Sequence, residues 1–589
     1  MALIVARKQL GYLWNTTMRA GPLLFSVLAL LPACDHQPEQ RLSVGTRFGG
    51  VFNLNETEPL RSIFPLTLTQ ASAFRIMSQV YQGLVSFDPA TLDIVPCLAW
   101  KWEIDESATR YTFHLRPGVR FHDDPAFPDG RGRELTADDV VRCFTAICTQ
   151  GIGDQMIWLF QDRVEGANAH YAATSGGVPT AEGVSGIRKV DDATVAITLT
   201  HPSPNFLQII AHQGCWIWPE ELSVAYGGEP GTHAIGTGPF SLHEVHAGEA
   251  MVLERNPHYW ESDAEGRALP YLDGVRVTFA EDKNAEFDEF TKGRVTALLE
   301  LPVDRLRDLK DSVDAVSGER RFTMRSIPAL TSQFYGFDAF HAPFKDLRVR
   351  RAFALAIDRR TLADSVLGGF ATPALHGLVA PGLEGYPYEK VPGVPFAPDS
   401  ARRLLAAAGY PEGRGFPPLQ LQVNADGFGY IRVAEAVQAM LERELHVPVS
   451  ISVLPADKHY ERVEMVQARF WREGWTADHP DPENFLALLY GKNAVMDTTM
   501  PASINNTRFH NEQFDDLFTK AARSTDNATR LADLAEAERV AMEEMPIIPL
   551  YHEQAVFLLH PWVMDLQINA IEFLDLTAVW FDRPLVPKR

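Results

Sequence analysis

Cysteine is scarce in this sequence, with five in 589 residues, which excludes a small scaffold held together by disulfide bonds. Basic runs are absent too: no five consecutive Lys or Arg residues occur, and 54 Lys and Arg stand against 76 Asp and Glu, a formal charge of −22. An acidic chain repels phosphate backbones, so nucleic acid is not expected as a partner. The 46% share of hydrophobic residues is typical of a folded protein and excludes a disordered chain.

The short motifs of common catalytic and nucleotide-binding sites are also absent. The sequence contains no GxSxG, no GxxxxGK[ST], no HExxH and no GxGxxG after a strand. His552 and Glu553 begin like a zinc-binding helix, but His560 lies too far along for a second ligand. Asp478 and the acids after it lack the glycine turn of a calcium loop. We therefore expect a protein that is not an enzyme and has no metal or cofactor.

The N-terminal segment differs from the rest of the chain. Residues 1–33 carry three basic residues and no acid, and the largely apolar run 23–31 is too short to span roughly 30 Å of hydrocarbon as a helix. This pattern is typical of a secretory signal. The run ends in Leu31-Pro32-Ala33-Cys34, which resembles a bacterial lipobox, so Cys34 is expected to be the lipid-modified first residue of the mature chain.

An ordinary signal peptide with an incidental cysteine is the alternative, and translation can start at Met1 or Met18. Cleavage before Cys34 leaves 51 Lys and Arg against 76 Asp and Glu, a formal charge of −25. Residues 34–41 then form a tether. The mature protein is expected outside the cytoplasm, anchored to the cell membrane by lipid. In a Gram-negative host, Asp35 resembles the signal that keeps lipoproteins on the periplasmic face of the inner membrane.

Helices and strands alternate irregularly along the mature chain. Apolar spacing predicts a helix over 69–82, and Thr136 is expected to cap another helix with Asp139 at its third position. Asp346 and Asn511 are expected to open two more helices. Alternating residues predict strands at 111–115 and 119–121 around a Pro-Gly turn, at 192–199, and in a hairpin over 241–255. This mixture indicates an α/β class.

The four cysteines of the mature chain beyond Cys34 permit three disulfide pairings, and the sequence does not select among them. They are Cys97, Cys143, Cys148 and Cys215. Cys143 and Cys148 point to different faces of one predicted helix, so they are not expected to pair with each other. A buried free thiol is the expectation for each.

Four segments together carry a family pattern. They are Tyr111-Thr112-Phe113-His114-Leu115-Arg116-Pro117-Gly118-Val119 with Leu135-Thr136-Ala137-Asp138-Asp139-Val140; Gly236-Thr237-Gly238-Pro239-Phe240 with Arg255-Asn256-Pro257-His258-Tyr259-Trp260; Pro343-Phe344-Lys345-Asp346-Leu347-Arg348 running to Ile357-Asp358-Arg359; and Gly474-Trp475-Thr476-Ala477-Asp478-His479-Pro480-Asp481-Pro482. In this order, behind a lipobox, they resemble the extracytoplasmic solute-binding proteins of ABC importers. The resemblance is to the peptide- and nickel-binding class, above all to oligopeptide- and dipeptide-binding proteins, and covers most of residues 45–585.

This resemblance implies an α/β, two-lobed periplasmic-binding-protein fold with an extra domain inserted in the first lobe. The first lobe would comprise 42–88, 185–327 and 550–589, the extra domain 89–184, and the second lobe 328–549. The chain would cross between lobes near 327 and 550, and bending there would close the lobes on a ligand. The resemblance implies a monomer that captures short peptides and passes them to the permease subunits of an ABC importer.

Asp478 is the residue that decides the ligand class. The resemblance implies that this aspartate pairs with the α-ammonium group of a peptide, and a carboxylate in a water-excluded cleft requires such a cationic partner. The alternative is that Asp478 caps the turn before Pro480-Asp481-Pro482.

Four further residues are expected at the cleft from the same resemblance. Arg472 occupies a position where oligopeptide binders hold a basic residue for a ligand carboxylate; the alternative is a surface arginine. Trp475 would wall a side-chain pocket or else belong to a core. Gly474 would leave the backbone free to pair with an extended peptide. Segments 69–72 and 332–335 are also expected at the cleft, with Tyr335 as a wall.

Two other interpretations remain at this stage. The first keeps the fold but exchanges the ligand for a nickel chelate, an oligosaccharide or an opine, none of which needs a buried partner for an ammonium group. The second is a secreted hydrolase, which the absence of a nucleophile motif disfavours. The sequence departs from the family in two places. The loop at 122–133 is longer, and Thr476 stands where some oligopeptide binders carry a disulfide-forming cysteine. Both departures weaken any transfer of the family's preference for peptide length.

Overall fold

The computed structural model describes residues 48–582, apart from 57–58, 69, 175–178, 181, 228–231, 247, 280–282, 300–321, 425–428 and 503. The predicted signal peptide, Cys34 and the tether therefore lie outside the described residues. None of the described helices combines the length and the apolar character needed to cross a membrane.

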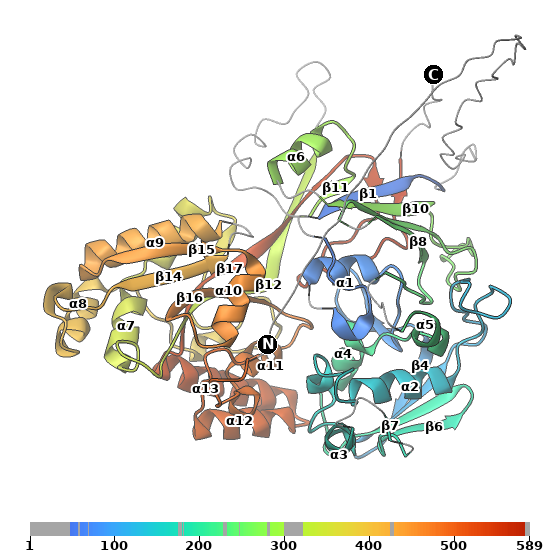
Figure 1. Cartoon of the computed structure of the whole chain (residues 1–589), viewed down its shortest axis with the longest axis horizontal. Coiled ribbons are helices and arrows are strands. Elements are labelled where there is room, and N and C mark those ends of the chain that lie inside the picture. The colour runs from blue at the N-terminus through green and yellow to red at the C-terminus, as the bar shows by residue number, and fades with distance from the viewer. Residues whose placement is uncertain are drawn as a thin grey trace, which may run out of the picture. The chain divides into compact units, whose positions relative to one another are not determined.

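Two four-stranded sheets and a short hairpin come mostly from the first half of the chain (Figure 1). One sheet has the order β1 (Val51–Glu56), β10 (Gly274–Phe279), β9 (Ala250–Arg255), β8 (Phe240–His246), in which only β1 and β10 are parallel. The other has the order β4 (Ala99–Ile104), β5 (Arg110–Leu115), β7 (Thr194–Thr198), β6 (Ile187–Asp191) and is antiparallel. The hairpin joins β2 (Val85–Phe87) to β3 (Ile94–Pro96).

A single hydrophobic core joins these sheets to their helices. Phe52 and Phe240 enter it from the first sheet, Phe113 from the second, and Phe144 from a helix, all fully buried. We call the part of the chain that packs in this core the first lobe. Its helices are α1 (Ala71–Met77), α2 (Ala137–Ile147), α3 (Ala167–Ala173), α4 (Phe206–Ile210) and α5 (Glu220–Tyr226), with short 3-10 turns at η1 (Pro65–Thr67), η2 (Ile157–Leu159) and η3 (Gln213–Cys215).

A larger sheet forms the centre of the second half of the chain. Its order is β11 (Ala297–Leu298), β17 (Ile547–Leu559), β12 (Thr323–Phe337), β16 (Phe470–Thr476), β14 (Leu419–Asn424), β15 (Val449–Leu454), with β13 (Ala371–Pro373) beside β17. Helix α9 lies along β14 and β15 (Figure 1). The helices here are α6 (Lys283–Thr291), α7 (Leu347–Leu355), α8 (Pro398–Ala407), α9 (Tyr430–Leu445), α10 (Ala456–Glu464), α11 (Pro482–Leu486), α12 (Glu512–Ala522) and α13 (Asn527–Glu544); β18 (Val563–Met564) and β19 (Trp580–Phe581) form a separate small pair.

Strands β12 and β17 connect two separate sets of core residues. Ala329 packs in the core of the first lobe, whereas Leu330 packs in a different core with α12 and α13. On β17 the change comes between Tyr551 and Ala555. The pairing of the two strands is irregular at this level, with a register shift after Pro328. We call the part that packs in the cores between these crossings the second lobe.

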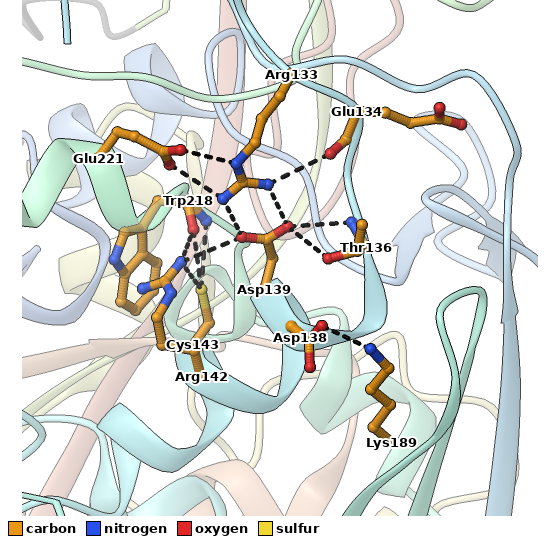
Figure 2. A network of polar contacts seen from close by, with 10 residues as sticks. All are labelled: Arg133, Glu134, Thr136, Asp138, Asp139, Arg142, Cys143, Lys189, Trp218 and Glu221. Carbon is orange, nitrogen blue, oxygen red and sulfur yellow. Dashed lines mark hydrogen bonds and ion pairs between the residues drawn. The ribbon is translucent and has the colours of Figure 1, made fainter. Parts of the chain in front are cut away.

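The predicted helix starts at Thr136, Asp346 and Asn511 are confirmed. Asp346 accepts a hydrogen bond from the backbone N–H of Arg348 at 2.8 Å, and Asn511 accepts one from Phe514 at 3.1 Å. Figure 2 shows the cap of α2, where Thr136 and Asp139 form a reciprocal capping box.

The network around this cap also fixes the inserted loop that ends at Arg133 (Figure 2). The Arg133 guanidinium donates to both carboxylate oxygens of Asp139, at 2.8 and 2.7 Å, and to Glu221 of α5. The loop after 117–118 does not pair as a second strand, because only an isolated bridge between Arg120 and Glu134 forms there. The longer loop is therefore held by the ion pairs of Arg133 together with backbone hydrogen bonds such as that from Phe121 to Arg133.

All four cysteines named above are buried and unpaired within the described part of the chain. Burial raises the pKa of Cys97 and Cys148 to about 12 each, and that of Cys143 to about 11. The expectation of buried free thiols is confirmed for these four residues.

Candidate functional site

A large cavity lies between the two lobes. Its volume is about 1410 Å³, which exceeds the roughly 300–1,000 Å³ of common small-molecule pockets. The first lobe contributes Phe74, Arg75, Trp158 and His212, among others, and the second lobe contributes the strand β16 and the turn after it. Arg472, Gly474, Trp475 and Asp478 all line this cavity.

Asp478 is a mostly buried carboxylate whose neighbours come from both lobes. Its side chain is 17% exposed, and its Oδ1 lies 3.5 Å from Nε2 of His212 in the first lobe. Nδ1 of His212 accepts a hydrogen bond from the backbone N–H of Gly214 at 3.0 Å, so in the neutral ring the proton is on Nε2 and points to Asp478. Asn484 donates to the other oxygen at 3.1 Å.

These donors keep Asp478 ionised. Burial acts to raise the pKa of Asp478, but the hydrogen bond and electrostatic attraction of His212 and the hydrogen bond from Asn484 together lower that pKa below its ordinary value. The neighbouring Asp481 caps helix α11, because its side chain accepts the backbone N–H of Glu483 at 2.8 Å. The carboxylate of Asp478 instead faces the cavity.

Asn484 links Asp478 to Trp475. The indole Nε1 of Trp475 donates to Oδ1 of Asn484 at 2.7 Å, and the backbone N–H of Asp478 donates to the same oxygen at 3.2 Å. Asn484 is buried at the third position of α11. Trp475 is therefore fixed at the cavity edge rather than enclosed in a core.

Arg472 is a buried cation with neutral partners. Its guanidinium lies 3.4 Å from the ring centroid of Tyr430 and donates to Asn424 at 3.1 Å, to Tyr460 at 3.3 Å, and to Gln333. Within the described part of the chain, its Nε–H has no hydrogen-bond partner. The hydrogen-bond partners of the guanidinium are neutral, and the charge of Glu553, which accepts from the same Gln333, acts on it from nearby.

Gly474 lies opposite Gln333 in the pairing of β16 with β12. A Cβ at this position would overlap the side chains of Gln333 and Arg472, so glycine is required for these two groups to meet. On its other edge β16 pairs with β14 only at Phe470 and Trp471, as far as the structure describes the chain. The carbonyl of Arg472 is hydrogen-bonded to Nε2 of His459 at 2.9 Å, so residues 474–476 keep a strand edge without a strand partner along the cavity.

Tyr335 does not belong to the cavity wall. It is 1% exposed and packs edge-on against Phe470, with 5.3 Å between ring centroids, in the core of the second lobe. Gln333, two residues earlier on the same face of β12, does line the cavity. The cavity ends before Tyr335, and the expectation of a wall at this residue is corrected.

His212 and Asn484 are site residues that sequence reasoning did not find. Asn484 follows the family motif closely, so a helix predicted to begin after Asp481 would have placed Asn484 in its first turn. His212 carried no such signal, because it lies far along the chain and reaches Asp478 only through the packing of the two lobes.

Comparison with known proteins identifies the family. Residues 93–497 match the model of the bacterial extracellular solute-binding proteins, family 5. The chain belongs to this family. It is similar to heme-binding protein A of Haemophilus influenzae, with 28% identity over 85% of this chain and 86% of the relative. It is also similar to di/tripeptide-binding protein 2 of Pseudomonas aeruginosa, with 27% identity over 80% of this chain and 84% of the relative.

Solved structures share the fold. The periplasmic binding protein DppA of Helicobacter pylori, in complex with the peptide STSA, aligns with a TM-score of 0.78 and 22% identity over 91% of this chain and 99% of the other. The murein tripeptide binding protein MppA of Escherichia coli aligns with a TM-score of 0.76 and 24% identity over 91% and 99%. The family and the two-lobed fold expected from the sequence motifs are confirmed. The protein is a bacterial extracellular solute-binding protein of family 5.

Proposed function

We propose that this protein captures short peptides between its two lobes and delivers them to the permease of an ABC importer. The observation that carries the proposal is the ionised, mostly buried carboxylate of Asp478 facing the cavity between the lobes. A ligand ammonium group is the cation that would balance this charge. Relatives named for di- and tripeptides and a structural neighbour in complex with a tetrapeptide support the same ligand class.

Arg472 supplies the complementary charge. Its buried guanidinium has neutral partners and an Nε–H without a partner in the described part of the chain, which suits a ligand carboxylate. Two opposite charges in one cavity wall fit a zwitterion, with its ammonium group at Asp478 and its carboxylate at Arg472. A sugar has no such pair of charges.

The strand edge between the two charges supports an extended ligand. Residues 474–476 line the cavity without a strand partner on one edge, so a peptide can add there through its own backbone. At about 3.3 Å per residue, 472 to 478 spans at most about 20 Å, which matches an extended peptide of roughly four to six residues.

Trp475 and Gly474 complete the site. The fixed Trp475 ring at the cavity edge would cover a ligand side chain, and Gly474 keeps room for the contact between Gln333 and Arg472. A nickel chelate, an oligosaccharide or an opine remains the alternative ligand class, but neither Asp478 nor Arg472 finds a natural partner in an uncharged sugar.

The domain boundaries belong to this proposal. We place the hinge where the chain crosses near 327 and 550, with the first lobe at 42–88, 185–327 and 550–589, an extra domain at 89–184 that is inserted in this lobe and shares its core, and the second lobe at 328–549. The change of core at Ala329–Leu330 and between Tyr551 and Ala555 supports these crossings. A lipid on Cys34 would keep the protein beside its permease, as a monomer that hands over one ligand at a time.

The experiment is a ligand screen on the mature chain with Cys34 replaced by serine. Mass spectrometry of the purified protein should detect bound peptides, and a mixture of tri- to hexapeptides should raise the melting temperature. Stabilisation by metal chelates or sugars alone would contradict the proposal.

A further inference from the structure

Helix α11 carries contacts of two different kinds. Its Asn484 holds Asp478 and Trp475 at the cavity, while the adjacent Glu483 makes hydrogen bonds to the first lobe. Nη2 of Arg163 lies 2.5 Å from Oε1 of Glu483, and Nδ2 of Asn205 lies 3.1 Å from Oε2. Both partners belong to the first lobe, since the residues that follow them, Val164 and Phe206, pack in its core.

The second lobe holds Glu483 in place for this contact. Arg530 of α13 is 2% exposed and donates to Oε2 of Glu483 at 3.3 Å and to Asp481 at 2.5 Å. In the first lobe the carbonyl of Trp158 accepts from Nη1 of Arg163 at 3.0 Å and fixes that guanidinium. Two arginines and two carboxylates therefore balance each other only while the lobes are together.

From this arrangement we infer that Glu483, Arg163 and Asn205 form a clasp that holds the two lobes closed, and that α11 couples the clasp to the ligand site. Separation of the lobes leaves Asp481 and Glu483 with Arg530 alone, an excess of one negative charge, and removes two donors from a carboxylate that is 4% exposed. The coupling follows because Asn484, beside Glu483 on the same turn, orients the carboxylate that we propose as the ligand anchor.

Burial distinguishes the clasp from an ordinary surface pair. Burial acts to raise the pKa of Glu483, but Arg163 and Arg530 lower it below the ordinary value, so Glu483 carries its charge in the closed state. Lys492 and Asp162 also approach each other across the lobes, at 3.5 Å, but their side chains are about half exposed. Exposed pairs contribute little, whereas loss of one partner from a buried pair is strongly unfavourable.

The test is a double-mutant cycle of Arg163→Met and Glu483→Gln, with tetra-alanine as the probe ligand and stopped-flow dissociation as the measurement. Removal of the clasp should raise the dissociation rate of the peptide at least tenfold and change the association rate less than threefold. The effects of the two substitutions on the dissociation rate should not be additive. Arg267→Met is the matched control, because Arg267 pairs with Asp263 inside the first lobe, and its rates should equal those of the wild type.

A dissociation rate of Arg163→Met within twofold of the wild type would overturn the clasp and leave the proposed function intact. The use of a peptide probe rests on the proposed function. If the wild type binds no peptide, that proposal fails, and the clasp is then judged by small-angle scattering of the ligand-free proteins. A larger radius of gyration for Arg163→Met supports the clasp, and equal radii contradict it.

Discussion

His212 of the first lobe and Asp478 of the second lobe meet across the cavity, with 3.5 Å between Nε2 and Oδ1. The histidine is 2% exposed and packs against Trp158, with 5.3 Å between ring centroids. A donor from one lobe thus reaches the proposed ligand anchor of the other. The same closure that buries a ligand also completes the hydrogen bonds of the anchor.

The first prediction concerns this donor. His212→Ala should weaken peptide binding about tenfold or more, because a hydrogen bond to a charged group contributes roughly 1.5–3 kcal/mol. Isothermal titration calorimetry with tetra-alanine measures the change. His258→Ala is the control, since its half-exposed side chain lies 3.8 Å from Asp123 and away from Asp478. Equal affinities of His212→Ala and the control would contradict a role in binding.

A second prediction follows from the lowered pKa of Asp478. The carboxylate must be ionised to bind an ammonium group, so affinity should stay constant as the pH falls from 7 to about 4 and be lost only below its ordinary range near 3.9. His212 and His479 face the same carboxylate, so the control is Asp478→Asn, whose residual binding should lack this acid limb. A wild-type midpoint at pH 5 or above would show that another group controls binding.

Peptide length provides a third prediction. If Asp478 and Arg472 bind the two ends of one ligand at a separation near the upper limit of about 20 Å, tetra- and penta-alanine should bind more tightly than di-alanine, whose extended length is about 7 Å. Arg472→Met should remove most of this preference by weakening the longer peptides alone. A competition series measured by calorimetry compares the lengths. An equal loss of affinity for all peptide lengths, or no loss of affinity, would show that Arg472 does not bind the ligand carboxylate.

The network of Figure 2 yields a prediction on stability. Asp139→Ala removes the capping box of α2 and one of the two acidic partners of Arg133, and should lower the free energy of unfolding by about 2–3 kcal/mol. Asp138→Ala is the matched control, because its side chain is 70% exposed and its pair with Lys189 lies at the surface. Urea unfolding followed by circular dichroism measures both. A similar small loss for the two variants would mean that Arg133 does not fix the loop.

Sequence reasoning predicted most of the fold because its signals are local. The caps at Thr136, Asp346 and Asn511 each lie within four residues of the N–H or side chain that they bind, so the sequence contains both partners side by side. The family motifs then supplied the two-lobed arrangement that local signals cannot provide.

The site was harder to predict from the sequence, because not all of its contacts are local. Asp478, Trp475, Gly474 and Arg472 share one strand and its following turn, and all of them line the cavity. The prediction that Tyr335 lines the cavity was wrong, because the point at which a strand leaves the cavity depends on tertiary packing. His212 could not be found at all, since its partner comes from the other lobe.

Replacement of Asp478 tests the account most directly. Calorimetry should compare the wild type with Asp478→Asn, which keeps the size of the side chain and removes its charge, while circular dichroism confirms the fold. We predict at least a hundredfold loss of affinity for tetra-alanine, and a smaller loss for a peptide whose N-terminus is acetylated. Unchanged affinity of Asp478→Asn for tetra-alanine would contradict the assignment of the ligand anchor.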